Sequence, residues 1–343
     1  MASLLKSQTA VSRTPARLTA SASNVTLNKS EFLFYSNNPE TLDSADLADN
    51  GKYLNMASVS GNGQVYIWHA NKTGQTIKHC VLVYNPNSYA VKINVTNYGL
   101  TNTSNTGASD ADAWEKYYNG QSTSLTVAAG GYGNLFLSSV SNNYNFGVVA
   151  RLNIVKSGTS TAAGVTLYDL AYVSNSSGAT GFATAESYAA TKRTRGKGAG
   201  YYTAITFPTV SPANADGVGY TIAASNDSFS GADCSVITDG SGQASGVLEG
   251  AYGQQYNITI PIKNTTGIAR KFRIYIGSRG GYAFPFVNFA GGIAKYTSAI
   301  SSMQYVDVIE TDTIASGSTA SVNFSTVVTA MAATPYFIGV RVV

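Results

Sequence analysis

Charged side chains are scarce in this chain: Asp, Glu, Lys and Arg together make up 12% of its 343 residues. That is roughly half the share in an average soluble domain. The net charge of +4 is spread along the chain, which does not give the dense basic face of a nucleic-acid-binding protein. Few charges also mean weak repulsion between copies. We therefore expect the chain to bind copies of itself and not nucleic acid. The one basic run contains Lys192, Arg193, Arg195 and Lys197.

Histidine and cysteine each occur only twice. Cys80 and Cys234 match no metal or redox spacing, and they can be free thiols, one disulfide or links between copies. His69 and His79 flank a predicted hairpin and could face each other, but a metal site needs three or four ligands and no third lies nearby in the sequence. No Gly-x-Ser-x-Gly nucleophile elbow precedes a predicted helix. We therefore expect no enzyme, no catalytic residue and no cofactor.

Long apolar runs are also absent. No segment approaches the roughly 18–20 apolar residues that span a bilayer, so we expect no membrane span. The polar stretch that ends at Leu27 contains Lys6, Arg13 and Arg17 and has no apolar core of a secretory signal. A location outside the cell would therefore require either that a signal has been removed from the sequence or that the protein leaves by another route.

Acidic residues gather in two places, and oxygen-rich clusters of this kind can hold calcium. Neither cluster follows the calcium-binding loop pattern, so solvated loop acids are the favoured interpretation and a calcium site is the alternative. The clusters are Asp43, Asp46 and Asp49, and Asp110, Asp112 and Glu115.

Alternation of apolar and polar residues dominates what is present. Val91, Ile93 and Val95 alternate with polar residues, and the run from Tyr256 to Ile262 does the same. Turn clusters rich in Asn, Gly, Ser and Thr separate such runs. The pattern predicts an all-β protein built from β-sandwiches, with a short helix near residues 110–118 and another near residues 183–190.

Three blocks recur in the same order in the two halves of the chain. A strand, an Asn-x-Thr-Gly turn and a second strand occur around Asn71 and again around Asn264. Residues 125–130 resemble residues 312–317, and each half then closes with an apolar strand that carries one arginine, Arg151 or Arg341. The blocks predict an internal duplication that aligns Asn71 with Asn264.

The repeat also predicts a domain organisation. We expect an extended N-terminal arm at residues 1–29 and one β-sandwich unit at residues 30–156. A connector rich in Ser, Gly and Ala, partly strand near residues 165–173, occupies residues 157–200. A second, tandem β-sandwich unit follows at residues 201–343.

Three segments carry a resemblance to known proteins: VYIWHAN at residues 65–71, VLVYNP at 81–86 and YNITIPIKN at 256–264. They resemble duplicated β-sandwich proteins found on or outside the cells of spore-forming Gram-positive bacteria. The resemblance covers most of the chain after about Glu31. It implies an extracellular location or a cell or spore surface, and it supplies no catalytic residues.

The leading functional expectation is a structural subunit of an extracellular filament, appendage or surface layer. An extended tail binds most easily by adding a strand to the sheet edge of a neighbour, so the arm is the expected link between copies. Its apolar residues, which would enter that edge, are Leu4, Leu5, Val11, Leu18, Val25 and Leu27.

Two other functions fit the composition. The first is a monomeric surface adhesin or carbohydrate-binding protein, in which aromatic rings stack on a glycan. The other is a viral capsid or fibre protein, because those are also rich in β-structure. The candidate glycan-stacking residues are Trp68, Trp114, Tyr117 and Tyr118.

Overall fold

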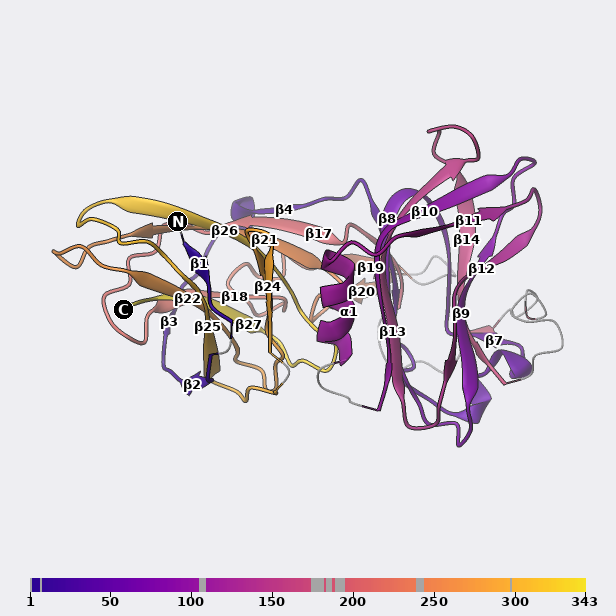
Figure 1. The fold of residues 1–343 in the computed structure, drawn as a ribbon, viewed down its shortest axis with the longest axis horizontal. Coiled ribbons are helices and arrows are strands. Elements are labelled where there is room, and N and C mark those ends of the chain that lie inside the picture. The colour runs from indigo at the N-terminus through magenta and orange to yellow at the C-terminus, as the bar shows by residue number, and fades with distance from the viewer. Residues whose placement is uncertain are drawn as a thin grey trace. The chain divides into compact units, whose positions relative to one another are not determined.

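Strands dominate the fold, as the alternating sequence predicts (Figure 1). The computed structural model describes residues 2–6, 8–104, 109–173, 182, 187–188, 195–238, 244–296 and 298–343. Within this part of the chain the only α-helix is α1 (Ser109–Tyr118), at the first predicted position. Most of residues 183–190, where a second helix was expected, lie outside the described residues, and Ser187–Tyr188 form strand β15.

The chain forms two β-sandwich units. The N-terminal sandwich comprises Lys29–Tyr201 and Val236–Val247, and the C-terminal sandwich comprises Met1–Asn28, Tyr202–Ser235 and Leu248–Val343. This division departs from the expected one because pairing, and not chain order, decides membership. Arm strands pair within the C-terminal sandwich, while part of the expected connector and a hairpin from the second half pair within the N-terminal sandwich.

The C-terminal sandwich has two sheets. One has the order β25-β22-β27-β18, and the other has the order β24-β23-β26-β21-β17. Arm strands extend the edges of both sheets. The elements are β1 (Ser3–Leu4), β2 (Val11–Ser12), β3 (Ala16–Arg17), η1 (Ala22–Asn24), β4 (Val25–Leu27), β17 (Tyr202–Thr206), β18 (Val218–Ile222), β21 (Gln255–Lys263), β22 (Phe272–Ser278), β23 (Phe286–Phe289), β24 (Gly292–Lys295), β25 (Gln304–Glu310), β26 (Thr319–Val327) and β27 (Tyr336–Val342).

The N-terminal sandwich is built around one long strand, β8, which contributes to both of its sheets. Residues Gly61–Ala70 of β8 pair with β13, whereas Asn55–Ser60 pair with β14. The elements are β5 (Phe32–Ser36), β6 (Thr41–Leu42), η2 (Ser44–Asp46), η3 (Ala48–Asn50), β7 (Lys52–Tyr53), β8 (Asn55–Asn71), β9 (Ile77–Tyr84), β10 (Val91–Thr103), β11 (Thr123–Val127), β12 (Tyr132–Val140), β13 (Asn145–Lys156), β14 (Gly164–Tyr172), β16 (Gly196–Ala199), β19 (Val236–Thr238) and β20 (Ala244–Val247).

The two sandwiches share a strand order. In the C-terminal sandwich, β25-β22-β27-β18 face a sheet containing β21-β26-β23-β24, which is the arrangement of an eight-stranded jelly roll. In the N-terminal sandwich, β11-β10-β13-β8 repeat the first sheet and β9-β12 repeat part of the second. The helix α1 stands in the sequence of the N-terminal sandwich where β23 and β24 stand in that of the C-terminal sandwich. The common order is what a duplication would give, and the duplication itself stays a prediction.

This strand order changes one part of the predicted repeat. Asn264 follows β21, whose counterpart is β9, and the residue that follows β9 is Asn85. Asn71 instead is the last residue of β8. Alignment of Asn71 with Asn264 therefore matched two turns of the same local chemistry at different places in the fold. The other two blocks do fall at equivalent places, the β11–β12 and β25–β26 turns and the closing strands β13 and β27.

All three turns use the same hydrogen bonds. The side-chain amide of Asn264 donates to the carbonyls of Ile268 (2.8 Å) and Ile314 (2.7 Å), while its Oδ1 accepts from the backbone N–H (3.0 Å) and hydroxyl (2.8 Å) of Thr266. Asn71 and Asn85 repeat the pattern of two donated and two accepted bonds, and Asn85 donates to a third carbonyl. Each asparagine thus ties its own turn to a second segment of the chain.

The cores confirm the alternation read from the sequence. Val91, Ile93 and Val95 are buried between the sheets of the N-terminal sandwich, and their polar neighbours Lys92 and Asn94 are half-exposed. The same holds for β21, whose isoleucines enter the C-terminal core. No described helix combines the length and the apolar character that crossing a membrane requires.

Candidate assembly site and buried polar clusters

The N-terminal arm supplies edge strands to the C-terminal sandwich of its own chain. β1 and β2 pair with the outer edge of β25, and β3 pairs with the outer edge of β18, so the arm extends one sheet on both sides. β4 pairs with β17 and extends the other sheet. An extended, polar segment without a core of its own becomes ordered here because backbone N–H and C=O groups at sheet edges need partners.

The apolar residues expected to mediate assembly lie on this sandwich with unequal burial. Leu4, Leu18 and Val25 pack against the C-terminal core, whereas the side chain of Val11 remains 46% exposed. The backbone N–H of Leu5 donates to the carbonyl of Val308 at 2.9 Å. Leu27 is half-buried in β4, opposite Thr203 of β17.

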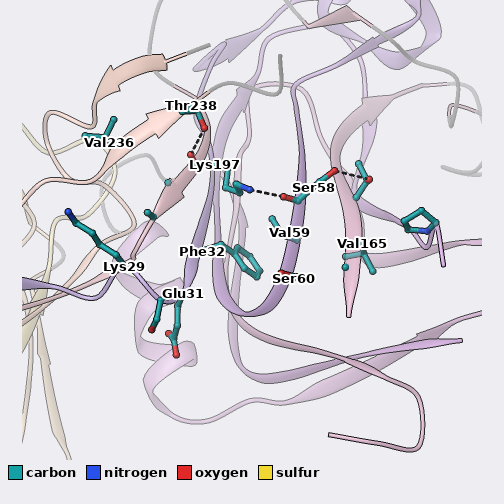
Figure 2. A pocket seen from close by; sticks show the side chains of 16 residues that line it. Lys29, Glu31, Phe32, Ser58, Val59, Ser60, Val165, Lys197, Val236 and Thr238 are labelled. Atoms are coloured by element: carbon teal, nitrogen blue, oxygen red, sulfur yellow. Dashed lines mark hydrogen bonds between the residues drawn. The ribbon is translucent and has the colours of Figure 1, made fainter. Parts of the chain in front are cut away.

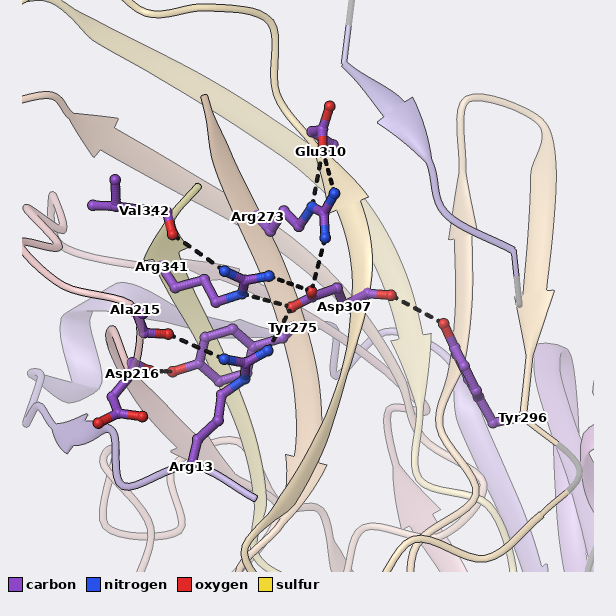
Figure 3. A network of polar contacts seen from close by, with 10 residues as sticks. All are labelled: Arg13, Ala215, Asp216, Arg273, Tyr275, Tyr296, Asp307, Glu310, Arg341 and Val342. Atoms are coloured by element: carbon purple, nitrogen blue, oxygen red, sulfur yellow. Dashed lines mark hydrogen bonds and ion pairs between the residues drawn. The ribbon is translucent and has the colours of Figure 1, made fainter. Parts of the chain in front are cut away.

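One ion pair anchors the middle of the arm (Figure 3). Nη2 of Arg13 lies 3.5 Å from Oδ1 of Asp307 on β25, and its Nη1 donates to the carbonyl of Ala215 at 3.1 Å. The guanidinium also stands over the ring of Tyr275, 5.6 Å from its centroid. Because an arginine head bound by a carboxylate, a carbonyl and an aromatic face keeps one orientation, Arg13 fixes where the arm lies.

Asp307 is shared by three arginines. Arg341 donates to both of its oxygens, at 3.0 Å and 2.7 Å, and Arg273 donates to Oδ2 at 3.3 Å. Burial alone would raise the pKa of Asp307, but the hydrogen bonds and charge of Arg341, with Arg13 and Arg273, lower it. The pKa of Arg273 is raised, chiefly by its hydrogen bond to Glu310. The carboxylate of Asp307 is therefore ionised. Without the arm it would still have Arg273 and Arg341 as partners.

A second cluster lies inside the N-terminal sandwich, where the two histidines singled out in the sequence do meet. Nε2 of His69 lies 2.9 Å from Oδ2 of Asp169, and Nε2 of His79 lies 2.8 Å from Oδ1 of the same residue. All three side chains are buried. Nδ1 of His69 lies 2.6 Å from the carbonyl oxygen of Pro39, so both of its ring nitrogens face acceptors.

Asp169 is the partner that sequence reasoning missed. Burial would raise the pKa of Asp169, but hydrogen bonds from His69 and His79 overcome that effect and lower it. The sequence did hold a signal for this residue, because Asp169 is the single carboxylate within the largely apolar strand β14. Among the described residues, no group of three or more His, Cys, Asp or Glu side chains is placed to hold a metal ion.

The aromatic residues considered for glycan stacking are mostly interior. Trp68, Trp114 and Tyr117 are buried, and Tyr118 is half-buried. Trp114 packs against Tyr66, Tyr117 and Tyr118. Ring faces that already contact other side chains are not available to a sugar, so the structure does not favour the glycan-binding alternative.

The acidic residues of the first cluster bind the backbone of the protein itself. Asp43 accepts from the N–H of Ala45, Asp46 accepts from the N–H of Asp43, and Asp49 accepts from the N–H of Val173. These three contacts turn the carboxylates toward backbone N–H donors of the chain.

In the second acidic cluster, Asp110 lies 3.2 Å from the hydroxyl of Tyr66, which donates to it. Asp112 and Glu115 sit on the same helix, α1, as Asp110.

The two cysteines, Cys80 and Cys234, are buried free thiols, so the disulfide considered from the sequence is not formed. Lys192 and Arg193 of the basic run lie outside the described residues.

A cavity of about 720 Å³ opens in the N-terminal sandwich (Figure 2). Phe32, Val59 and Val165 form an apolar wall, and Lys197 reaches across the cavity to donate to the carbonyl of Ser58 at 3.0 Å. The lining also includes Lys29 and Glu31, and the exposed surface of the cavity is chiefly apolar.

No family model and no curated protein sequence matches this chain. Lac15 from a marine microbial metagenome is 10% identical over 80% of this chain, which spans 54% of the Lac15 chain, with a TM-score of 0.11. Oxalate decarboxylase from Bacillus subtilis is 10% identical over 93% of this chain and 78% of its own, with a TM-score of 0.12. McoA multicopper oxidase from Aquifex aeolicus is 8% identical over 85% of this chain and 64% of its own, with a TM-score of 0.11. TM-scores this low establish no shared fold, so the function must be argued from the chain's own residues.

Proposed function

We propose that this chain is the structural subunit of an extracellular filament, appendage or surface layer, linked through its N-terminal arm. The observation that carries the proposal is the pairing of β1 to β4 with the outer edges of both sheets of the C-terminal sandwich. Sheet edges bind any strand of suitable length and register, and recognition by strand addition is a common way to join proteins.

The arm can be supplied by either of two chains. In the structure it fills the edges of its own C-terminal sandwich, and an identical arm from a second copy would make the same hydrogen bonds and the same Arg13–Asp307 ion pair. Exchange of an identical element between copies is a low-cost route to assembly. When each copy gives its arm to the next, the contact does not close, and a filament results.

The surface of the N-terminal sandwich supports association as well. Strand β12 pairs with β9 on one side, and among the described residues no strand pairs with its other side. This edge carries no charge and no proline, and the side chain of Leu137 on it is 52% exposed. Edges of this kind tend to pair with other chains.

A closed shell is the second candidate, and the strand order favours it. Jelly rolls occur in viral capsid domains as well as in other proteins. The same arm exchange would then close on itself around a symmetry axis. Electron microscopy of the purified protein separates the two, since filaments or sheets support the first proposal and closed particles support the second.

Disulfide trapping between copies tests arm exchange directly. Ser12 of β2 faces Gln304 of β25 in the pairing register. One copy carries Ser12→Cys, a differently tagged copy carries Gln304→Cys, and the two are mixed under assembly conditions and oxidised. Arm exchange predicts a covalent product that contains both tags. Thr319→Cys on β26, outside the arm's register, is the matched control and should give no product.

Deletion of residues 1–27 provides the second test. The proposal predicts folded protein that no longer assembles, as measured by size-exclusion chromatography and negative-stain microscopy. Normal filaments from the truncated chain would show that the arm is not the link. A full-length protein that stays monomeric at high concentration would overturn the structural-subunit proposal as a whole.

A further inference from the structure

One edge of the N-terminal sandwich is open at a place where the C-terminal sandwich has a strand. In the C-terminal sandwich, β26 lies between β21 and β23, so both of its sides are paired. Its counterpart β12 pairs with β9, and among the described residues no strand pairs with the other side. The helix α1 is bound to β10, where the side-chain amide of Asn97 donates to the carbonyl of Tyr117 at 3.0 Å. This edge of the sheet is therefore incomplete within the described chain.

The register shows which backbone groups of β12 point away from β9. The N–H of Asn85 donates to the carbonyl of Gly131 at 2.9 Å, which makes these residues a hydrogen-bonded pair of the antiparallel ladder. Such pairs alternate along the ladder with pairs that exchange no hydrogen bonds. Tyr132 and Asn134 belong to the second kind. Their N–H and C=O groups therefore point out of the sheet edge.

The open part of this edge is short and has Gly133 at its centre. A turn with Gly130 at φ 62° precedes it, and a bulge with Phe136 at φ 57° ends it. Beyond the bulge, the carbonyl of Ser139 already accepts from the side-chain amide of Asn102 at 2.6 Å. An incoming strand thus finds regularly spaced hydrogen-bonding groups only between the turn and the bulge.

The chemistry of this edge suits a second copy of the same strand. The nine residues of β12 include no charged residue and no proline. Two copies therefore do not repel each other, and no backbone donor is missing. Tyr132 is 39% exposed and Asn134 is also exposed, so the rest of the chain covers neither side chain.

We propose that β12 of one copy pairs antiparallel with β12 of a second copy about a twofold axis at Gly133. Tyr132 then lies opposite Asn134 of the second copy, and Asn134 lies opposite Tyr132. Each of these two opposed pairs exchanges two hydrogen bonds, which gives four in all. The turns and the bulges of both copies stay outside the contact. A twofold contact is self-complementary and joins copies in pairs, whether or not the arms are exchanged.

Disulfide trapping between full-length copies tests this register. One copy carries Tyr132→Cys, a differently tagged copy carries Asn134→Cys, and the two are mixed and oxidised. Opposed residues of a hydrogen-bonded pair lie about 5.5 Å apart between their Cα atoms, within the range that a disulfide spans. A covalent product with both tags is expected. Ser139→Cys in place of Asn134→Cys is the matched control on the same strand, and it should give no product because it lies outside the register.

Competition shows whether the backbone edge makes the contact. An excess of unmodified chain of about tenfold should lower the yield of the product about tenfold by mass action. Asn134→Lys should compete poorly, because a charged side chain on a sheet edge opposes pairing. Ser139→Lys adds the same charge beyond the bulge and should compete like the unmodified chain. In sedimentation velocity, which needs no cysteine, Asn134→Lys should dissociate at a concentration about tenfold higher than Ser139→Lys.

Each outcome supports or overturns the proposal. No product from Tyr132→Cys and Asn134→Cys, with circular dichroism showing both chains folded, would overturn the contact, and so would equal dissociation of the two lysine variants. Equal yield with Ser139→Cys would overturn the register. Arm exchange is measured separately by Ser12→Cys and Gln304→Cys, so product from one cysteine pair without the other shows which contact joins the copies.

Discussion

Oδ2 of Asp169 lies 2.9 Å from Nε2 of His69, and neither side chain has any exposed surface. The same carboxylate binds His79 through its other oxygen. We expect Asp169→Asn to destabilise the N-terminal sandwich by about 1–3 kcal/mol, because asparagine offers one acceptor oxygen where two buried histidine rings now have one each, and one ring is left unsatisfied. Urea unfolding measures the change. Asp216→Asn, an exposed residue, should change stability by no more than about 0.5 kcal/mol.

Acid should weaken the same cluster. The pKa of Asp169 is lowered in the folded state, so the folded chain binds fewer protons than the unfolded chain at this group. The stability it contributes is complete above the ordinary carboxyl value of 3.8 and is lost as pH falls through and below that value. Thermal melts from pH 6 down to about pH 2 should show the loss. Asp169→Asn should show a shallower acid slope, and an identical slope would contradict the prediction.

The pKa of Asp233 shifts in the opposite direction to that of Asp169. Burial first, and then the hydrogen bond and charge of Asp227, raise the pKa of Asp233 well above its ordinary value. Its folded form therefore holds a proton that the unfolded form releases, so its contribution to stability falls as pH rises. Asparagine keeps both a donor toward Asp227 and an acceptor for the N–H of Ala223, which now binds Asp233 at 2.8 Å. We expect Asp233→Asn to stabilise the C-terminal sandwich at pH 8 by about 1 kcal/mol. Destabilisation of that size in urea unfolding would refute the idea.

The asparagine turns should be intolerant of a change of one atom. Asp in place of Asn264 keeps the shape, removes two donated hydrogen bonds and places a carboxylate oxygen against the carbonyls of Ile268 and Ile314. Since each buried group left unsatisfied costs about 1–3 kcal/mol, Asn264→Asp should cost about 3 kcal/mol or more. Chemical denaturation provides the measurement. Asn226→Asp, at an exposed position, tests for a general effect of the added charge.

Arg13 should hold the arm without holding the sandwich together. Asp307 retains Arg273 and Arg341 when Arg13 is replaced, so no buried charge is left alone. We expect Arg13→Gln to speed hydrogen exchange in residues 8–20 about fivefold, which corresponds to about 1 kcal/mol, with little effect elsewhere. Lys6→Gln removes an exposed arm charge and should leave exchange unchanged. Equal exchange in the wild type and Arg13→Gln would show that the ion pair does not anchor the arm.

Much of the local structure could be predicted from the sequence because strand periodicity is a local property. Tyr256, Ile258 and Ile260 are buried as their alternation predicts, since successive side chains in a strand point to opposite faces. Alternation says which face is buried but not which strand lies alongside. For that reason the Asn71 and Asn264 turns looked equivalent, although Asn85 occupies the place that corresponds to Asn264.

Contacts between distant residues set the limit of the sequence reasoning. The two histidines could be expected to meet because they flank one hairpin. Asp169 joins them from β14, far along the chain, and nothing local in the sequence indicated that pairing. The arm was expected to be extended and to add strands. Its docking on the C-terminal sandwich of the same chain depends on edges of β25 and β18, which local sequence does not reveal.

The pairing of Ser3 with Glu310 also sets an order of events during synthesis. A ribosome makes residues 2–27 long before β25 and β18 exist, and the N-terminal sandwich can complete most of its strands in the meantime. The arm is therefore synthesised before the edges of β25 and β18 with which it pairs. Under the arm exchange proposed above, whether an arm closes on its own chain or on that of another copy depends on which sheet edge it reaches first, which is a matter of rates and local concentration.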